Sequence, residues 1–104
     1  MILIDVGSES KQQIQIPFSD GTATIRLYFS SFNSCWFMSV SYGTNTVNNI
    51  LIEYGVNLTY PFRHIFPFGV VCISDSEVRP VFIDSFSSGD SALIFYNPDE
   101  NFNL

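Results

Sequence analysis

Charged side chains are scarce in this sequence of 104 residues. It contains 4 lysines and arginines and 10 aspartates and glutamates, so charged residues make up 13% of the chain, where about 25% is typical of globular proteins. Hydrophobic residues reach 46%, which excludes a disordered chain. So few charges cannot coat a whole surface, and we therefore expect part of the surface to be buried against other molecules.

Positive charge is the rarer of the two signs, and it is dispersed along the chain at Lys11, Arg26, Arg63 and Arg79. The formal net charge is -6. A protein with this charge repels phosphate groups over most of its surface and offers no cluster of cations to an anionic lipid headgroup. The sequence thus predicts no specific nucleic-acid binding and no membrane association, and no apolar run is long enough for a membrane-spanning helix.

Residues that perform catalysis or bind metals are also few. His64 is the single histidine, in a loop rich in proline and phenylalanine, which favours a packed side chain over a catalytic base. Cys35 and Cys72 lie in apolar runs without a CxxC spacing, and they are predicted to be buried free thiols. The acidic residues stand in turn sequences, and the six glycines form no phosphate-binding loop. The sequence therefore predicts no catalytic, metal or cofactor site, and no enzyme.

What the sequence has in abundance is alternation of apolar and polar residues, the pattern of strands covered on one face. Residues 13–18 and 24–29 alternate around a turn with Asp20-Gly21 and predict a β-hairpin; residues 35–42 predict the next strand. A short strand and a loop, with one helical turn as an option, are expected within 47–64. The apolar run 68–73 is typical of a strand covered on both faces, and further strands are predicted at 78–83, on a sheet edge, and at 92–96. The fold class predicted is all-β: a small antiparallel β-sandwich or a partly open β-barrel.

The chain is long enough for one domain, which we expect over residues 12–97. Residues 1–11 begin with apolar residues in alternation, as in a first strand or in an arm that adds to the sheet of another chain. Residues 98–104 are expected to be a polar tail.

Aromatic side chains are the remaining candidates for a site, with 11 Phe, 5 Tyr and 1 Trp. A platform on which sugars stack is one use for them, formed by Trp36 with Phe37, Tyr54, Tyr60 with Phe62, and Phe66 with Phe68. A core between two sheets also requires large side chains, and the cores of subunit interfaces are rich in aromatic residues and poor in charge. Core, interface and sugar platform are all compatible with the sequence.

The linear order of several segments resembles the baseplate plug domain of contractile-tailed bacteriophages. The segments that carry this resemblance span residues 12 to 96: Gln12-Gln13-Ile14-Gln15-Ile16, Asp20-Gly21, Leu27-Tyr28-Phe29, Trp36-Phe37-Met38-Ser39-Val40, Ile50-Leu51-Ile52, Gly55-Val56-Asn57-Leu58, Phe68-Gly69-Val70-Val71 and Ser88 to Tyr96.

The resemblance implies a non-enzymatic structural protein of the virion, made in the host cytoplasm. It would pack in the central hub of the baseplate, near the tube lumen and the spike. Its partners would be hub, tail-tube and spike proteins, and it would be present in several copies in a cyclic assembly. A small carbohydrate-binding sandwich module is the alternative, and an enzyme that uses His64 is a third reading.

Within this reading, two groups of residues are candidate functional residues. Apolar residues expected at subunit interfaces are Ile2, Ile4, Tyr60, Phe62, Phe66 and Phe102. Acidic residues expected to face the lumen, where negative charge repels DNA, are Asp75, Glu77, Asp84 and Asp90.

Overall fold

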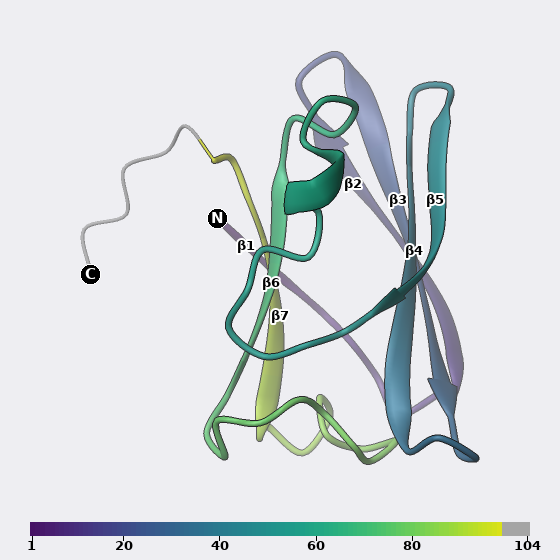
Figure 1. Cartoon of the computed structure of the whole chain (residues 1–104), viewed down its shortest axis with the longest axis vertical. Coiled ribbons are helices and arrows are strands. Elements are labelled where there is room, and N and C mark those ends of the chain that lie inside the picture. Colours follow the sequence, from purple (N-terminus) through teal and green to yellow (C-terminus); the bar gives the residue numbers. More distant parts are fainter. Residues whose placement is uncertain (99–104) are drawn as a thin grey trace.

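The computed structural model describes residues 1–98 and contains two antiparallel sheets packed face to face (Figure 1). One sheet has three strands in the order β1-β7-β6, which are β1 (Ile2–Ile4), β6 (Gly69–Ser74) and β7 (Ser91–Tyr96). The other has the order β2-β3-β4-β5, with β2 (Lys11–Phe18), β3 (Gly21–Ser30), β4 (Cys35–Tyr42) and β5 (Asn45–Leu51). The sheets do not close into a barrel, so the β-sandwich prediction is confirmed.

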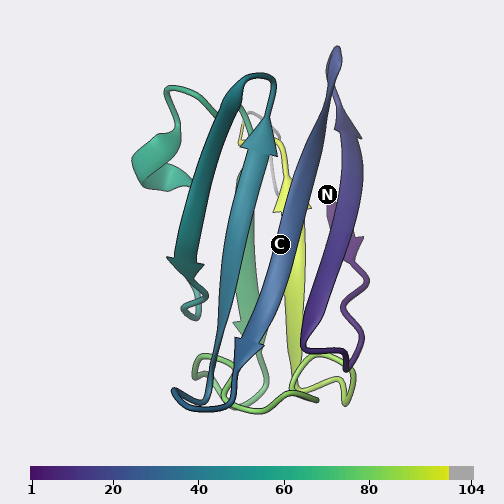
Figure 2. The ribbon, with the colours of Figure 1, turned by 90° about the vertical axis from the view of Figure 1, so that its right-hand side faces the viewer.

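The four-stranded sheet follows directly from the alternating sequence (Figure 2). In the β2–β3 hairpin Ile14 pairs with Ile25 and Ile16 with Ala23, which places their side chains on one face. Ser19 in the connecting turn has a positive φ of 56°, a conformation suited to a tight hairpin turn. Pro17 lies in β2, a strand at the edge of the sheet, where its missing N–H costs no ladder hydrogen bond.

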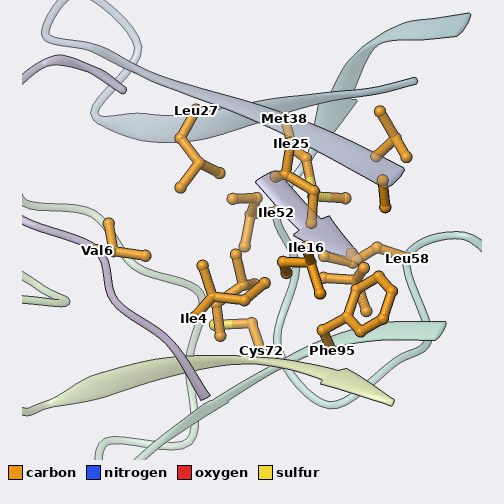
Figure 3. Packing of buried hydrophobic residues seen from close by; sticks show 14 of the residues in the cluster. Ile4, Val6, Ile16, Ile25, Leu27, Met38, Ile52, Leu58, Cys72 and Phe95 are labelled. Carbon is orange, nitrogen blue, oxygen red and sulfur yellow. The ribbon is translucent and has the colours of Figure 1, made fainter. Parts of the chain in front are cut away.

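The core fills the space between the sheets and is dominated by branched aliphatic and aromatic side chains (Figure 3). Phe68 is 1% exposed. The centroid of its ring lies 4.7 Å from the ring centroid of Phe95 and 5.5 Å from that of Phe66. Trp36 is fully buried, with the ring of Phe86 at 5.5 Å in an edge-on arrangement. These contacts join both sheets and the 75–90 loop into a single core.

Two strand predictions need correction. Residues 78–83 form no strand, because this segment uses local turn hydrogen bonds such as Glu77 N–H to Ser74 O and Phe82 N–H to Ser85 Oγ. The run 68–73 does form β6, but only one of its faces is covered, since Val71 is half-buried and Ile73 is 46% exposed. At the start of the chain, Ile2–Ile4 pair with β7 of the same chain.

The free edge of β6 is covered by the segment 54–59, which runs along it. Gly55 N–H donates to Cys72 O (2.8 Å) and Leu58 N–H donates to Val70 O (2.7 Å). Asn57 fastens this segment, since its Oδ1 accepts from the backbone N–H of Val70 (3.1 Å) and of Thr59 (3.2 Å), and the Thr59 hydroxyl lies 3.0 Å from it. A covered edge cannot pair with strands of other chains.

Replacing Asn57 with alanine is expected to lower the free energy of unfolding by about 1–3 kcal/mol, because the donors of Thr59 and Val70, both fully buried residues, lose their acceptor. Asn57→Asp keeps acceptor oxygens of the same geometry and should retain most of the stability. Urea unfolding of the two variants measures the difference, and equal losses would contradict this role of the side-chain oxygen.

Candidate interaction surfaces

The six apolar residues predicted at subunit interfaces do not form one surface. Ile2 is 46% exposed in β1, and Tyr60 is 57% exposed in the short 3₁₀ helix Tyr60–Phe62, where Phe62 is half-buried. Ile4 and Phe66 are core residues, at 4% and 1% exposure; their prediction as surface residues is corrected because both pack between the sheets. Phe102 lies outside the described residues.

The four acidic residues predicted to face a lumen lie in one loop, residues 75–90, at one end of the sandwich (Figure 1). Asp75, Glu77 and Asp84 are exposed, and Asp90 is half-buried, where its Oδ2 accepts from the Ser76 hydroxyl (3.1 Å). Exposed apolar residues share this end: Phe32 in the turn between β3 and β4, and Val78, Phe82 and Ile83 in the loop itself.

The 75–90 loop is attached to the core by Trp36. The indole Nε1–H donates to Phe82 O (3.0 Å), and the Phe86 side chain packs edge-on against the indole ring. Asp75 N–H donates to Asp90 O (2.8 Å), which closes the base of the loop where β6 ends and β7 begins. The acidic residues are thereby carried on a braced loop.

The histidine and the two cysteines, the residues most often used in catalysis or metal binding, lie in separate segments of the structure. His64 lies in the loop after the 3₁₀ helix, as predicted, but it is exposed, so the prediction of a packed side chain is wrong. Cys35 and Cys72 are buried free thiols, as predicted. Burial, and to a lesser extent the negative charge of Asp90, raise the pKa of Cys72 to about 12, so this side chain is an uncharged thiol at neutral pH. Among residues 1–98 no group of three or more His, Cys, Asp or Glu is placed to hold a metal ion.

Trp36 cannot belong to a sugar-stacking platform, because no part of its ring reaches the surface. Tyr60 is exposed, but the Arg63 guanidinium lies over its ring, 4.1 Å from the centroid. Phe37 is half-buried and stacks on Tyr28 with 5.2 Å between ring centroids. The aromatic residues named for this platform are thus spread over the core and separate parts of the surface.

The two outer faces of the sandwich differ in chemistry, a feature that the sequence analysis missed. Apart from the stacked rings of Tyr28 and Phe37, the outer face of the four-stranded sheet is polar, with hydrogen bonds from Arg26 Nε to Gln13 Oε1 (3.1 Å) and between the Ser41 and Thr46 hydroxyls (3.0 Å). The outer face of the three-stranded sheet, here called the apolar face, has no polar side chain except a tyrosine; it comprises Met1, Leu3, Val71, Ile73, Ala92, Ile94 and Tyr96.

Strand register explains the apolar face. Leu3 and Val71 both pair with Ile94, and Ile73 pairs with Ala92, so these side chains stand together on the side away from the core. Tyr96 pairs with Gly69, and its ring lies over the glycine, where a Cβ would come within 2.7 Å of the Tyr96 Cε1. This cover raises the pKa of the Tyr96 hydroxyl. The continuous apolar runs of these strands were the signal for the face.

The fold and its surfaces define a small two-sheet β-sandwich with one uncovered apolar sheet face and an acidic loop at one end. Over residues 1–99 the chain matches the family described as the cyanophage baseplate Pam3 plug gp18, and it belongs to that family. The match includes β1 and confirms the resemblance to baseplate plug domains. The family name indicates a phage baseplate plug, a structural component that associates with other baseplate proteins.

No curated protein matches the chain. Across residues 1–98 there is no helix of the length and apolarity needed to cross a membrane.

Proposed function

We propose that this chain is a non-enzymatic plug of a contractile phage tail, packed in the central hub of the baseplate beside the tube lumen and above the spike. The match to the baseplate plug family over residues 1–99 carries this proposal. Hub, tail-tube and spike proteins are its neighbours, and it is present in several copies in a cyclic arrangement. The protein is made in the host cytoplasm and carried in the virion.

In this position the surfaces have separate roles. Of the predicted interface residues, the exposed Ile2 and Tyr60 and the half-buried Phe62 contact neighbouring subunits. The carboxylates of Glu77 and Asp84 in the 75–90 loop face the lumen, and those of Asp75 and Asp90 lie at the base of this loop, between the lumen and a neighbouring subunit. Their loop and the net charge of -6 repel DNA without specific contacts, so that the genome does not adhere to the plug as it passes.

Comparison of tails with and without the chain tests this location. Cryo-electron microscopy of particles from a phage that lacks the gene, and from the same phage complemented in trans, should differ in density on the tail axis above the spike. Density at the periphery of the baseplate, or particles that contain none of the complemented chain, would contradict the proposal.

A further inference from the structure

The apolar face of the three-stranded sheet carries several side chains that are exposed in the part of the chain described, residues 1–98. Leu3 is 68% exposed, Met1 61% and Ile73 46%. Past the edge of β6, Gly55 and Asn57 line the same hollow as Met1 and Ile94. In antiparallel sheets one face is commonly solvated and polar, as on the four-stranded sheet here.

The border of the apolar face is acidic at one end. Hollows at the end where β6 stops and β7 starts are lined by Leu3, Ile73 and Ala92 together with Asp5, Asp75 and Asp90. Neither these hollows nor the one at the opposite end of the face is lined by lysine or arginine. Carboxylates at the edge of a dry interface are costly when they have no ionic partner. A protein that covers the face is therefore expected to place cations opposite them.

The apolar face of a second copy does not supply enough cations to balance these carboxylates. Two apolar faces packed in the same direction bring acidic borders together. Packed in opposite directions, each acidic border meets the end lined by Met1, Gly55, Asn57 and Tyr96, which offers one amino group, that of Met1, against three carboxylates. Packing the polar outer face of another copy there would bury its glutamine, serine and threonine side chains against a surface without hydrogen-bonding partners.

We infer that the apolar face is the docking surface for a different baseplate protein, which presents an apolar, sheet-like or flat helical surface with lysine or arginine opposite Asp5, Asp75 and Asp90. This inference rests on the proposed function, because it takes the neighbours to be baseplate proteins. The inference names the face through which the chain contacts another baseplate protein, and the family membership does not specify this face. Loop tips beyond the border, such as Glu77 and Asp84, lie outside the contact.

A competition during assembly tests the face. A phage without the gene is complemented with two copies at once, tagged wild type and the variant Leu3→Thr/Ile73→Thr, and mass spectrometry compares their ratio in purified particles with that in the cell. Threonine keeps β propensity at these exposed strand positions. We expect the variant to be depleted in particles by about tenfold or more, since two apolar contacts at an interface core are lost.

The matched control is Val78→Thr/Ile83→Thr, which changes two exposed apolar residues outside the face and should be incorporated like wild type. Asp5→Lys, compared with Asp20→Lys, tests the charged border separately: the first should be depleted and the second should not. Thermal unfolding of each purified variant shows whether it folds.

Each outcome has a distinct meaning. Equal incorporation of the folded Leu3→Thr/Ile73→Thr variant and wild type overturns the docking face while leaving the proposed function intact. Absence of wild type from particles contradicts the proposed function. Light scattering that finds wild type to be a dimer, and the face variant a monomer, would make a second copy the occupant and overturn the inference.

Discussion

Replacing Trp36 with alanine is expected to lower the free energy of unfolding by about 3–5 kcal/mol, the range for a large aromatic side chain removed from a core. The ring is fully buried and contacts Phe29 and Phe86, with 5.5 Å between ring centroids in each case. The variant also loses the hydrogen bond from the indole to Phe82 O, so the 75–90 loop loses its attachment to β4. Urea unfolding followed by circular dichroism measures the loss, because Trp36 is the single tryptophan and the variant has no indole fluorescence.

The adjacent residue provides the control. Phe37 points to the outer side of the same strand, where it is half-buried and stacks on Tyr28. Phe37→Ala should lower the free energy of unfolding by less than Trp36→Ala. It loses the stacking contact with Tyr28, worth about 0.5–1.5 kcal/mol, and the burial of a smaller apolar area. It leaves the 75–90 loop untouched. Limited proteolysis should therefore cut within residues 75–90 faster in Trp36→Ala than in Phe37→Ala. Similar cleavage of both variants would show that the indole does not brace the loop.

The four-stranded sheet was predictable because its sequence states which face is buried. Along residues 13–18 and 38–42 apolar and polar side chains alternate, and a shift of one residue would turn the apolar side chains of these stretches to solvent. The pattern thus specifies strand, face and pairing together. The confirmed family resemblance rested on these segments together with later ones, as far as Tyr96.

The three-stranded sheet was not predictable in the same way. Its strands are apolar at successive positions, so the sequence alone could not show whether Ile4 or Leu3 points to the core. The register with β7 decides it: Ile4 pairs with buried Leu93, and Leu3 with Ile94 on the outer side. A continuous apolar run predicts cover on both faces, and within residues 1–98 the outer face of these strands keeps exposed side chains such as Leu3 and Ile73. That difference between sequence and structure is the feature from which the docking face was inferred.

The 75–90 loop shows a second limit. Val78 to Ile83 has the composition of an edge strand, but the edge of β6 is already covered through bridges to Tyr54 and Asn57. A strand prediction needs a free partner as well as suitable residues, and sequence patterns do not reveal that the partner is taken. The segment instead forms turns, with Glu77 at a positive φ of 58°, and its acidic side chains project at the end of the sandwich.

Reversing charge at the tip of this loop is expected to slow genome ejection, on the order of tenfold, if the loop faces the lumen. Glu77→Lys/Asp84→Lys changes two exposed carboxylates outside the apolar face and changes the net charge from -6 to about -2, since each replacement adds two positive charges. Lysine attracts the phosphate backbone that the carboxylate repels, and DNA that adheres to the plug leaves the tail more slowly. Ejection is measured as the time course of DNA release from particles triggered in vitro.

The control places the same charge change at the other end of the sandwich. Asp20→Lys/Thr22→Lys/Thr44→Lys also adds four positive charges, at exposed positions in and beside the turns opposite the 75–90 loop (Figure 1), and should leave the ejection rate near that of wild type. Raising the ionic strength should reduce the effect of the loop variant, because the Debye length falls from about 8 Å at 0.15 M to about 3 Å at 1 M. Equal ejection rates for the two variants would show that the acidic loop does not face the path of the DNA. The charge of the loop would then serve the solubility of the protein before assembly.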